Sequence, residues 1–104
     1  MRSHAQAVVI GGGVVGCSIL YHLTKLGWSD VVLLERSELT SGSTWHAAAN
    51  IHGLHDNTNI SRLQHYTMQL YQELEKESGQ SCGVFQPGSL YLAQSEAREH
   101  QLRL

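Results

Sequence analysis

Three glycines at a fixed spacing are the first residues in this chain whose pattern suggests chemistry. Gly11, Gly13 and Gly16 match G-x-G-x-x-G within the stretch GGGVVG. In this pattern the first glycine allows a tight turn, the second lets the backbone approach a pyrophosphate, and the third lets a helix pack closely on a strand. A helix that begins here also offers unpaired N–H groups and a partial positive charge to phosphates. The spacing therefore predicts a dinucleotide site, without distinguishing NAD from FAD.

A carboxylate lies where the ribose of a dinucleotide is expected. Glu35 ends the apolar run DVVLLE, about 20 residues beyond the glycines, where an acidic residue typically accepts hydrogen bonds from ribose hydroxyls. The alternative is a glycine turn without a ligand and a glutamate that merely ends a strand. The glycine spacing and the carboxylate together favour the dinucleotide site.

A histidine then stands among unusually small side chains. His46 occurs in SGSTWHAAAN, residues 41–50, and its small neighbours would let the backbone come close to a planar ring system. The hydroxyl groups of Ser43 and Thr44 can hydrogen-bond phosphate or ribitol oxygens, and an imidazole nitrogen is a competent nucleophile. Taken alone, however, a single histidine after a loop is more often a structural residue. For Trp45, packing in a core is at least as readily expected as contact with a ring-shaped ligand.

A strand, a helix and a second strand are expected to position these residues. Residues 6–10 are rich in β-branched side chains and predict a strand. Residues 14–26 have apolar side chains at helical spacing, with Gly27 as a stop, and residues 30–35 predict a second buried strand. Such a unit places both strands side by side and parallel, with a right-handed crossover. The predicted fold class is α/β, a Rossmann-like βαβ unit with an incomplete parallel sheet and flanking helices.

The remaining residues predict a loop, a helix, a strand and a helix in turn. Residues 36–58 are rich in Ser, Thr, Gly, Asn and His and are expected to form a loop with at most a short helix over residues 44–49. Helical periodicity returns over residues 59–78 and ends at Gly79. The stretch VFQPGSLYLAQ, residues 84–94, predicts strand structure with a turn at Pro87-Gly88. Ser95 predicts the N-cap of a last helix.

Composition limits the class of protein. A length of 104 residues allows one small domain, and 41% hydrophobic with 15% charged residues favours a folded chain. The net charge of −2 argues against a nucleic-acid partner, and no apolar run is long enough to cross a bilayer. Cys17 and Cys82 do not make a disulfide framework, so we expect two free thiols in a reducing compartment.

The ends of the chain lead to two further expectations. The first predicted strand begins within a few residues of Met1, which leaves no room for a signal or transit peptide. We therefore expect a cytoplasmic location and no membrane partner. A parallel sheet needs helices on both faces and more strands than are found here, so we expect residues 1–104 to be the N-terminal part of one truncated domain.

The chain resembles the N-terminal end of the dimethylglycine and sarcosine dehydrogenases, within the glycine-oxidase and D-amino-acid-oxidase class of flavoproteins. The resemblance is carried by VVIGGGVVGCSILYHLTKLGWSDVVLLERSELTSGSTWHAAAN and by GVFQPGSLYLAQ, and ELTSGSTWHAA is its most specific part. Members of this family bind FAD in a Rossmann-like domain and oxidise N-methylated glycines. The resemblance thus implies an FAD-binding domain and an enzyme that acts on the CH–NH group of dimethylglycine or sarcosine, a small amine, by oxidative N-demethylation with hydride transfer to the flavin.

The resemblance also implies which residues contact the cofactor. In many members the histidine of the STWHAAG-type motif carries the flavin covalently, so His46 is the expected attachment residue. The implied set is Gly11, Gly13, Val14, Val15 and Gly16 in the phosphate turn, Glu35 and Arg36 at the ribose, and Gly42, Ser43, Thr44, Trp45, His46, Ala47, Ala48, Ala49 and Asn50 along the flavin. Relatives usually have glycine at Ala49-Asn50, so the loop after His46 is expected to follow a different path.

A metal site is an alternative for the histidines, and we expect none. His46, His52, His55 and Asp56 are close in sequence, but they lack cysteine partners and fall in a predicted loop without the usual ligand geometry. The sequence leaves open whether His52, His55 and Asn57 lie near the flavin or the substrate.

Two alternatives to the dehydrogenase remain. One is a deaminating amino-acid oxidase, and the other is a catalytically silent FAD- or NAD-binding module with a structural or regulatory role. Neither the catalytic residues nor the electron acceptor can be named from this sequence. It is also open whether a tetrahydrofolate-binding domain follows Leu104.

Overall fold

The computed structural model describes residues 3–53 and 55–103 of the chain. These residues form two compact units, residues 1–50 and residues 51–104, which are described separately. Among the described residues, no helix is both long enough and apolar enough to span a membrane.

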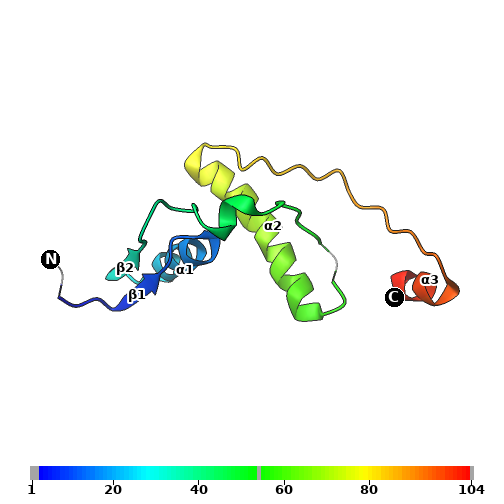
Figure 1. Ribbon diagram of the computed structural model, residues 1–104, viewed down its shortest axis with the longest axis horizontal. Coiled ribbons are helices and arrows are strands. Elements are labelled where there is room, and N and C mark those ends of the chain that lie inside the picture. The colour runs from blue at the N-terminus through cyan, green and yellow to red at the C-terminus, as the bar shows by residue number, and fades with distance from the viewer. Residues whose placement is uncertain (1–2, 54, 104) are drawn as a thin grey trace. The chain divides into compact units, whose positions relative to one another are not determined.

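The first unit contains the predicted βαβ arrangement. Strand β1 (Ala7–Ile10) leads through the glycine turn into helix α1 (Val14–Lys25), which is followed by strand β2 (Val31–Leu34) (Figure 1). The two strands are parallel neighbours, with Ala7 opposite Val31 and Ile10 opposite Leu34. The predicted strand pairing is therefore confirmed, and each element begins or ends within one residue of its expected limits.

Helix α1 ends at a glycine, as its sequence predicts. Gly27 has a φ of +90°, a conformation that glycine adopts without steric cost. Its N–H donates to the carbonyl oxygen of Thr24 at 2.9 Å, and the N–H of Trp28 donates to that of Leu23 at 3.0 Å. These two bonds satisfy carbonyl groups that the end of a helix would otherwise leave unpaired.

The small sheet is covered on one face only. Val9 faces α1 at Gly16 and is the one hydrophobic residue in the described part of the chain that is buried. Because side chains alternate along a strand, its neighbours Val8 and Ile10 point to the other face, where Ile10 is 84% exposed. A parallel sheet is normally covered on both faces, so this sheet has an apolar face without a partner in the unit.

The loop after β2 contains one turn of 3-10 helix. This turn, η1 (Ser43–His46), is closed by a hydrogen bond from the N–H of Ala47 to the carbonyl oxygen of Thr44 at 3.2 Å. It is shorter and begins earlier than the helix expected over residues 44–49.

The second unit contains helices α2 (Thr58–Ser78) and α3 (Glu96–Arg103). Asn57 is the N-cap of α2, and its side chain accepts hydrogen bonds from the N–H groups of Asn59 and Ile60. Gly79 ends α2 in the left-handed conformation, with a φ of 68°. Both helices agree with their sequence patterns, apart from residue 104, which lies outside the described residues.

Ser95 acts as the predicted cap of α3. Its hydroxyl oxygen accepts a hydrogen bond from the N–H of Arg98 at 3.2 Å.

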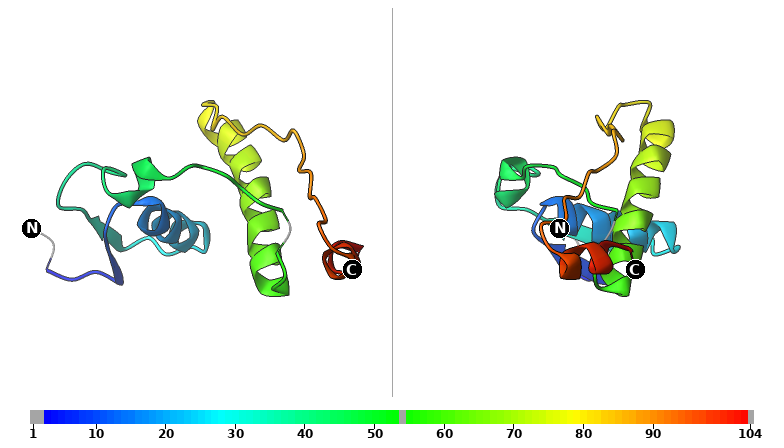
Figure 2. Two further views of the ribbon diagram at one scale, coloured as in Figure 1. Left: turned by 45° about the vertical axis from the view of Figure 1, so that its right-hand side comes forward. Right: turned by 90° about the vertical axis from the view of Figure 1, so that its right-hand side faces the viewer.

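The strand predicted over residues 84–94 is not formed. These residues run as an extended trace between α2 and α3 (Figure 2), and no strand among the described residues pairs with them. Phe85 and Leu90 are each 87% exposed. The alternation of apolar residues is real, but a strand exists only where a neighbouring strand accepts and donates its backbone hydrogen bonds.

We predict that Gly16→Ala destabilises the fold although alanine is the better helix former. A Cβ atom at Gly16 would lie 1.8 Å from the carbonyl oxygen of Gly11, so helix and turn must separate. We expect a loss of about 3 kcal/mol in the free energy of unfolding, measured by urea denaturation of the complete protein. The control is Gly42→Ala, where a Cβ would meet nothing within 4 Å. Equal stability of the two variants would refute the close contact.

Candidate functional site

The glycine turn brings the end of β1 into close contact with the start of α1. Gly11 has a φ of +104°, and its N–H donates to the carbonyl oxygen of Leu34 at 2.8 Å. The carbonyl of Gly11 points at Gly16, which is buried. Gly16 has no room for a side chain, and Gly11 has a φ that residues with a side chain rarely adopt, so the backbone itself forms the surface of the turn.

The first turn of α1 presents N–H groups of the kind that bind phosphate. The N–H of Val14 donates to the hydroxyl oxygen of Thr44 at 2.9 Å, and that of Cys17 donates to the carbonyl oxygen of Gly13 at 2.9 Å. Between them, the N–H groups of Val15 and Gly16 have no acceptor among the described residues. Two adjacent free donors at a helix N-terminus fit an anionic ligand such as the pyrophosphate of FAD.

Glu35 lies over the glycine turn as a fixed carboxylate. Its Oε2 accepts a hydrogen bond from the N–H of Gly12 at 2.6 Å, and its Oε1 accepts one from the N–H of Ser37 at 2.9 Å. The bond from Gly12, followed by the bond from Ser37, holds the pKa of Glu35 below its usual range. The side chain is therefore ionised at neutral pH, and each oxygen can still accept a further hydrogen bond from a hydroxyl group.

The loop after β2 is bound to the same turn at two more points. The N–H of Thr40 donates to the carbonyl oxygen of Gly12 at 2.9 Å, and Thr44 accepts from Val14 as described. Together with the bond from Gly12 to Glu35, three hydrogen bonds join residues 35–44 to residues 12–14. The structure therefore places the predicted phosphate turn, the carboxylate and the histidine loop in one site.

His46 ends η1 with an exposed ring and one nitrogen already bonded. Its Nδ1 lies 3.1 Å from the carbonyl oxygen of Gly42. A carbonyl oxygen can only accept, so Nδ1 carries the proton in the neutral ring and Nε2 carries the free lone pair. Nε2 is therefore the nitrogen of the neutral ring that can act as an acceptor.

Trp45 lies beside His46 and outside any core. Its ring centroid is 4.7 Å from that of His46, with the two planes tilted by 56°. The side chain is 71% exposed, so packing into a core, which the sequence left open, does not occur in this unit. Arg36 and the alanines that follow His46 are exposed as well.

Ala49 stands at a position whose backbone conformation favours glycine. It has a φ of +56°, in the left-handed region that favours glycine. The chain therefore adopts a backbone conformation suited to glycine with an alanine in its place.

Sequence reasoning missed two residues that hold the site together. Gly12 fills a variable position of the motif, yet its N–H binds Glu35 and its carbonyl oxygen binds Thr40. A Cβ at Gly12 would lie 2.6 Å from Leu39 and 3.1 Å from Glu35. The run of three glycines was the available signal for Gly12. Thr40 acts through its backbone and gave no signal.

His55 and Asn57 have local roles in the second unit. The N–H of Asn57 donates to Nδ1 of His55 at 2.9 Å, and Asn57 caps α2. In the described part of the chain, no three His, Cys, Asp or Glu side chains are grouped to hold a metal ion.

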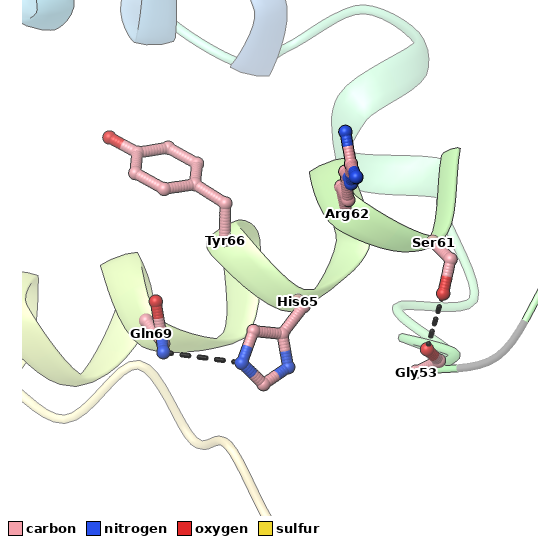
Figure 3. A pocket seen from close by; sticks show the side chains of 6 residues that line it. All are labelled: Gly53, Ser61, Arg62, His65, Tyr66 and Gln69. Atoms are coloured by element: carbon pink, nitrogen blue, oxygen red, sulfur yellow. Dashed lines mark hydrogen bonds between the residues drawn. The ribbon is translucent and has the colours of Figure 1, made fainter. Parts of the chain in front are cut away.

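A shallow hollow of about 440 Å³ lies along α2 in the second unit (Figure 3). His65 and Gln69 are joined in it by a 3.2 Å hydrogen bond, and the hydroxyl of Ser61 donates to the carbonyl oxygen of Gly53 at 3.2 Å. Arg62 and Tyr66 complete the lining. None of these residues was predicted to contact the cofactor.

We predict that Ala49→Gly stabilises the protein. Glycine removes a left-handed strain of about 1–2 kcal/mol but costs about 0.5–1 kcal/mol in backbone entropy. The expected net gain is about 0.5–1 kcal/mol in the free energy of unfolding, measured by urea denaturation. Ala47→Gly is the matched control, because Ala47 has a φ of −67° and should lose stability. A loss in both variants would contradict the conformation of Ala49.

The chain is similar to several characterised proteins over nearly its whole length. It is 47% identical over 102 residues to mitochondrial dimethylglycine dehydrogenase of Homo sapiens, which covers 98% of this chain and 12% of that protein. It is 46% identical over 99 residues to mitochondrial sarcosine dehydrogenase of Homo sapiens, covering 94% and 11%. It is also 40% identical over 98 residues to the mitochondrial pyruvate dehydrogenase phosphatase regulatory subunit of Mus musculus, covering 94% and 11%. The chain thus spans about an eighth of the length of these relatives.

The prediction of a cytoplasmic location is wrong on this comparison. The similar dimethylglycine dehydrogenases of Homo sapiens and Rattus norvegicus and the human sarcosine dehydrogenase are mitochondrial proteins. The prediction relied on the few residues before β1. A folded domain meets water near neutral pH in either compartment, so its composition does not distinguish them.

A family model confirms the resemblance seen in the sequence. The model described as FAD dependent oxidoreductase, named DAO, matches residues 6–104. This range includes the glycine turn, Glu35 and the His46 loop, together with the whole α/β unit. The chain therefore belongs to the DAO family of FAD dependent oxidoreductases.

Proposed function

We propose that residues 1–104 are the N-terminal part of the FAD-binding domain of an enzyme that oxidises N-methylated glycines. The observation that carries the proposal is the set of three hydrogen bonds that joins the His46 loop to a glycine turn with two free N–H donors. Identities of 47% and 46% to dimethylglycine and sarcosine dehydrogenases support the substrate class. The uncovered apolar face of the sheet, with Ile10 84% exposed, supports a larger domain.

The residues of the site divide the work of holding the cofactor. The N–H groups of Val15 and Gly16 bind the pyrophosphate, with Gly11 and Gly13 keeping the approach free of side chains. The Glu35 carboxylate accepts hydrogen bonds from the adenosine ribose, with Arg36 beside it. The small residues of the loop lie along the flavin: Gly42, Ser43, Thr44, Trp45, Ala47, Ala48, Ala49 and Asn50. When bound, FAD supplies a two-electron acceptor for the hydride of a C–H bond next to the amine nitrogen.

We further propose that Nε2 of His46 is the atom joined to the 8α-methyl group of FAD. Nδ1 is occupied by the carbonyl oxygen of Gly42, which leaves the lone pair on Nε2. The ring is exposed at the end of η1 and lies beside that of Trp45. An imidazole that is already oriented by one hydrogen bond is a suitable nucleophile. Joining Nε2 to the 8α carbon would break one C–H bond of that methyl group and release one proton from it and one from the imidazole. The two electrons would pass to the flavin itself, and the electron acceptor of the enzyme would then reoxidise it.

The relatives also bear on location and on domains beyond this chain. Their mitochondrial names support a mitochondrial location for this protein. A tetrahydrofolate-binding domain after residue 104 and the identity of the electron acceptor stay open, as does the choice between dimethylglycine and sarcosine.

A regulatory module is the second candidate function. The 40% identity to a pyruvate dehydrogenase phosphatase regulatory subunit favours it, because that protein is named for regulation. The same glycine turn and carboxylate would then hold a dinucleotide without turnover.

The function is tested by adding amines to the complete, flavin-loaded protein under anaerobic conditions. We predict that dimethylglycine or sarcosine bleaches the yellow absorbance, and that glycine, which lacks the N-methyl group, does not. Formaldehyde should appear in proportion to the amine consumed in the presence of an electron acceptor. Bleaching by glycine or other primary amino acids would indicate a deaminating oxidase. A yellow protein that no amine bleaches would indicate the silent module.

The attachment is tested by acid precipitation of the complete protein. We predict that the yellow colour stays in the pellet, and that mass spectrometry places the flavin on the peptide containing His46. In His46→Ala the colour should move to the supernatant, because only non-covalent contacts then hold the flavin. A wild-type supernatant containing all the flavin, or a modified peptide without His46, would contradict the attachment.

A further inference from the structure

Helix α1 begins at a residue that cannot cap it. Gly13 is the N-cap, with an extended backbone and no side chain to accept a hydrogen bond from the helix. A Cβ atom at Gly13 would lie 3.0 Å from the hydroxyl oxygen of Thr44. Glycine at this position therefore removes the local cap and at the same time makes room for one that comes from elsewhere in the chain.

Thr44 supplies the missing cap across 30 residues of sequence. Its Oγ1 accepts a hydrogen bond from the N–H of Val14 at 2.9 Å. The hydroxyl group binds the N–H of the first helical residue, whereas a serine or threonine at the N-cap position normally binds the N–H of the second or third. It leaves the N–H groups of Val15 and Gly16 free, so the cap and an anion can be bound together.

Thr44 also belongs to the turn that carries His46. The carbonyl oxygen of Thr44 accepts from the N–H of Ala47 at 3.2 Å, and Nδ1 of His46 is bonded to Gly42 at 3.1 Å. A 3-10 helix rises about 2 Å per residue. Thr44 and His46 are two residues apart, so the turn keeps them separated by about 4 Å along its axis. Thr44 is thus bonded to the first N–H of α1 and is linked to His46 through the backbone of the same 3-10 turn.

We propose that Thr44 is a positioning residue for flavin attachment, acting by fixing His46 relative to the glycine turn. The proposal rests on the proposed attachment at His46. It assigns to Thr44 a role distinct from contact with the cofactor: the hydroxyl sets where Nε2 stands once the pyrophosphate is bound. Misplacement of a reacting atom by about 1 Å can slow a reaction by about a hundredfold, so a bond at this point has a large effect on rate.

The test compares Thr44→Val, which has the same shape without the acceptor, with Thr44→Ser, which keeps the hydroxyl. Each complete protein is prepared without flavin and mixed with saturating FAD, and the acid-stable flavin is followed with time. We expect Thr44→Val to attach flavin at least about tenfold more slowly and Thr44→Ser to attach it at close to the wild-type rate. In a His46→Ala background, the Kd for FAD should change much less than the attachment rate does.

A variant on the other side of the bond keeps the test decisive if Thr44→Val folds poorly. Val14→Pro removes the donor, and proline is well tolerated as the first residue of a helix. The extended Gly13, with a φ of −78° and a ψ of −178°, suits a following proline. Val14→Pro should slow attachment as Thr44→Val does, and the double variant should be no slower than either single one.

The outcomes separate this proposal from the attachment itself. Wild-type attachment rates in Thr44→Val at saturating FAD would overturn the positioning role and leave His46 as the attachment residue. A weaker Kd in Thr44→Val/His46→Ala, with no change in the rate at saturation, would make Thr44 a simple cofactor ligand and would also overturn it. Absence of acid-stable flavin from the wild-type protein would defeat the attachment and this proposal together.

Discussion

The carbonyl group of Gly11 lies so close to Gly16 that the start of α1 touches the end of β1 through backbone atoms alone. The geometry of the phosphate turn depends on this contact. It sets the direction in which the helix N–H groups point and leaves those of Val15 and Gly16 free. It also brings the backbone of Gly12 within reach of the loop after β2. A side chain in this contact would separate the phosphate turn from the strands that support it.

The loop after β2 is ordered by hydrogen bonds to that contact, without burial in a core. Both backbone groups of Gly12 are hydrogen-bonded, the N–H to Glu35 and the carbonyl oxygen to the N–H of Thr40. The N–H of Val14 donates to the hydroxyl oxygen of Thr44. Few apolar side chains are buried in this unit, so directional polar bonds carry the geometry that packing would otherwise provide. Such bonds fix where one group stands relative to another more closely than apolar contact does, which suits a loop that must present one nitrogen atom.

The sequence allowed the βαβ unit to be predicted because its signals are local. Glycine spacing, apolar periodicity and a carboxylate at a strand end each act within a few residues of chain. The bonds of Thr40 and Gly12 could not be predicted, because they use backbone groups that every residue possesses. The left-handed backbone conformation of Ala49 was indicated only by the glycine that relatives usually have at Ala49-Asn50. The strand expected over residues 84–94 does not form because a strand needs a partner strand to share its backbone hydrogen bonds. The local sequence does not indicate whether such a partner is present.

The central claim is that one glycine turn positions both the pyrophosphate and the histidine. A crystal structure of the complete protein with its flavin tests this most directly. The account predicts pyrophosphate oxygens within about 3 Å of the N–H groups of Val15 and Gly16, the Thr44 hydroxyl still bound to the N–H of Val14, and a covalent bond between Nε2 of His46 and the 8α-methyl carbon. A pyrophosphate bound away from these N–H groups, or a flavin joined to another residue, would contradict it.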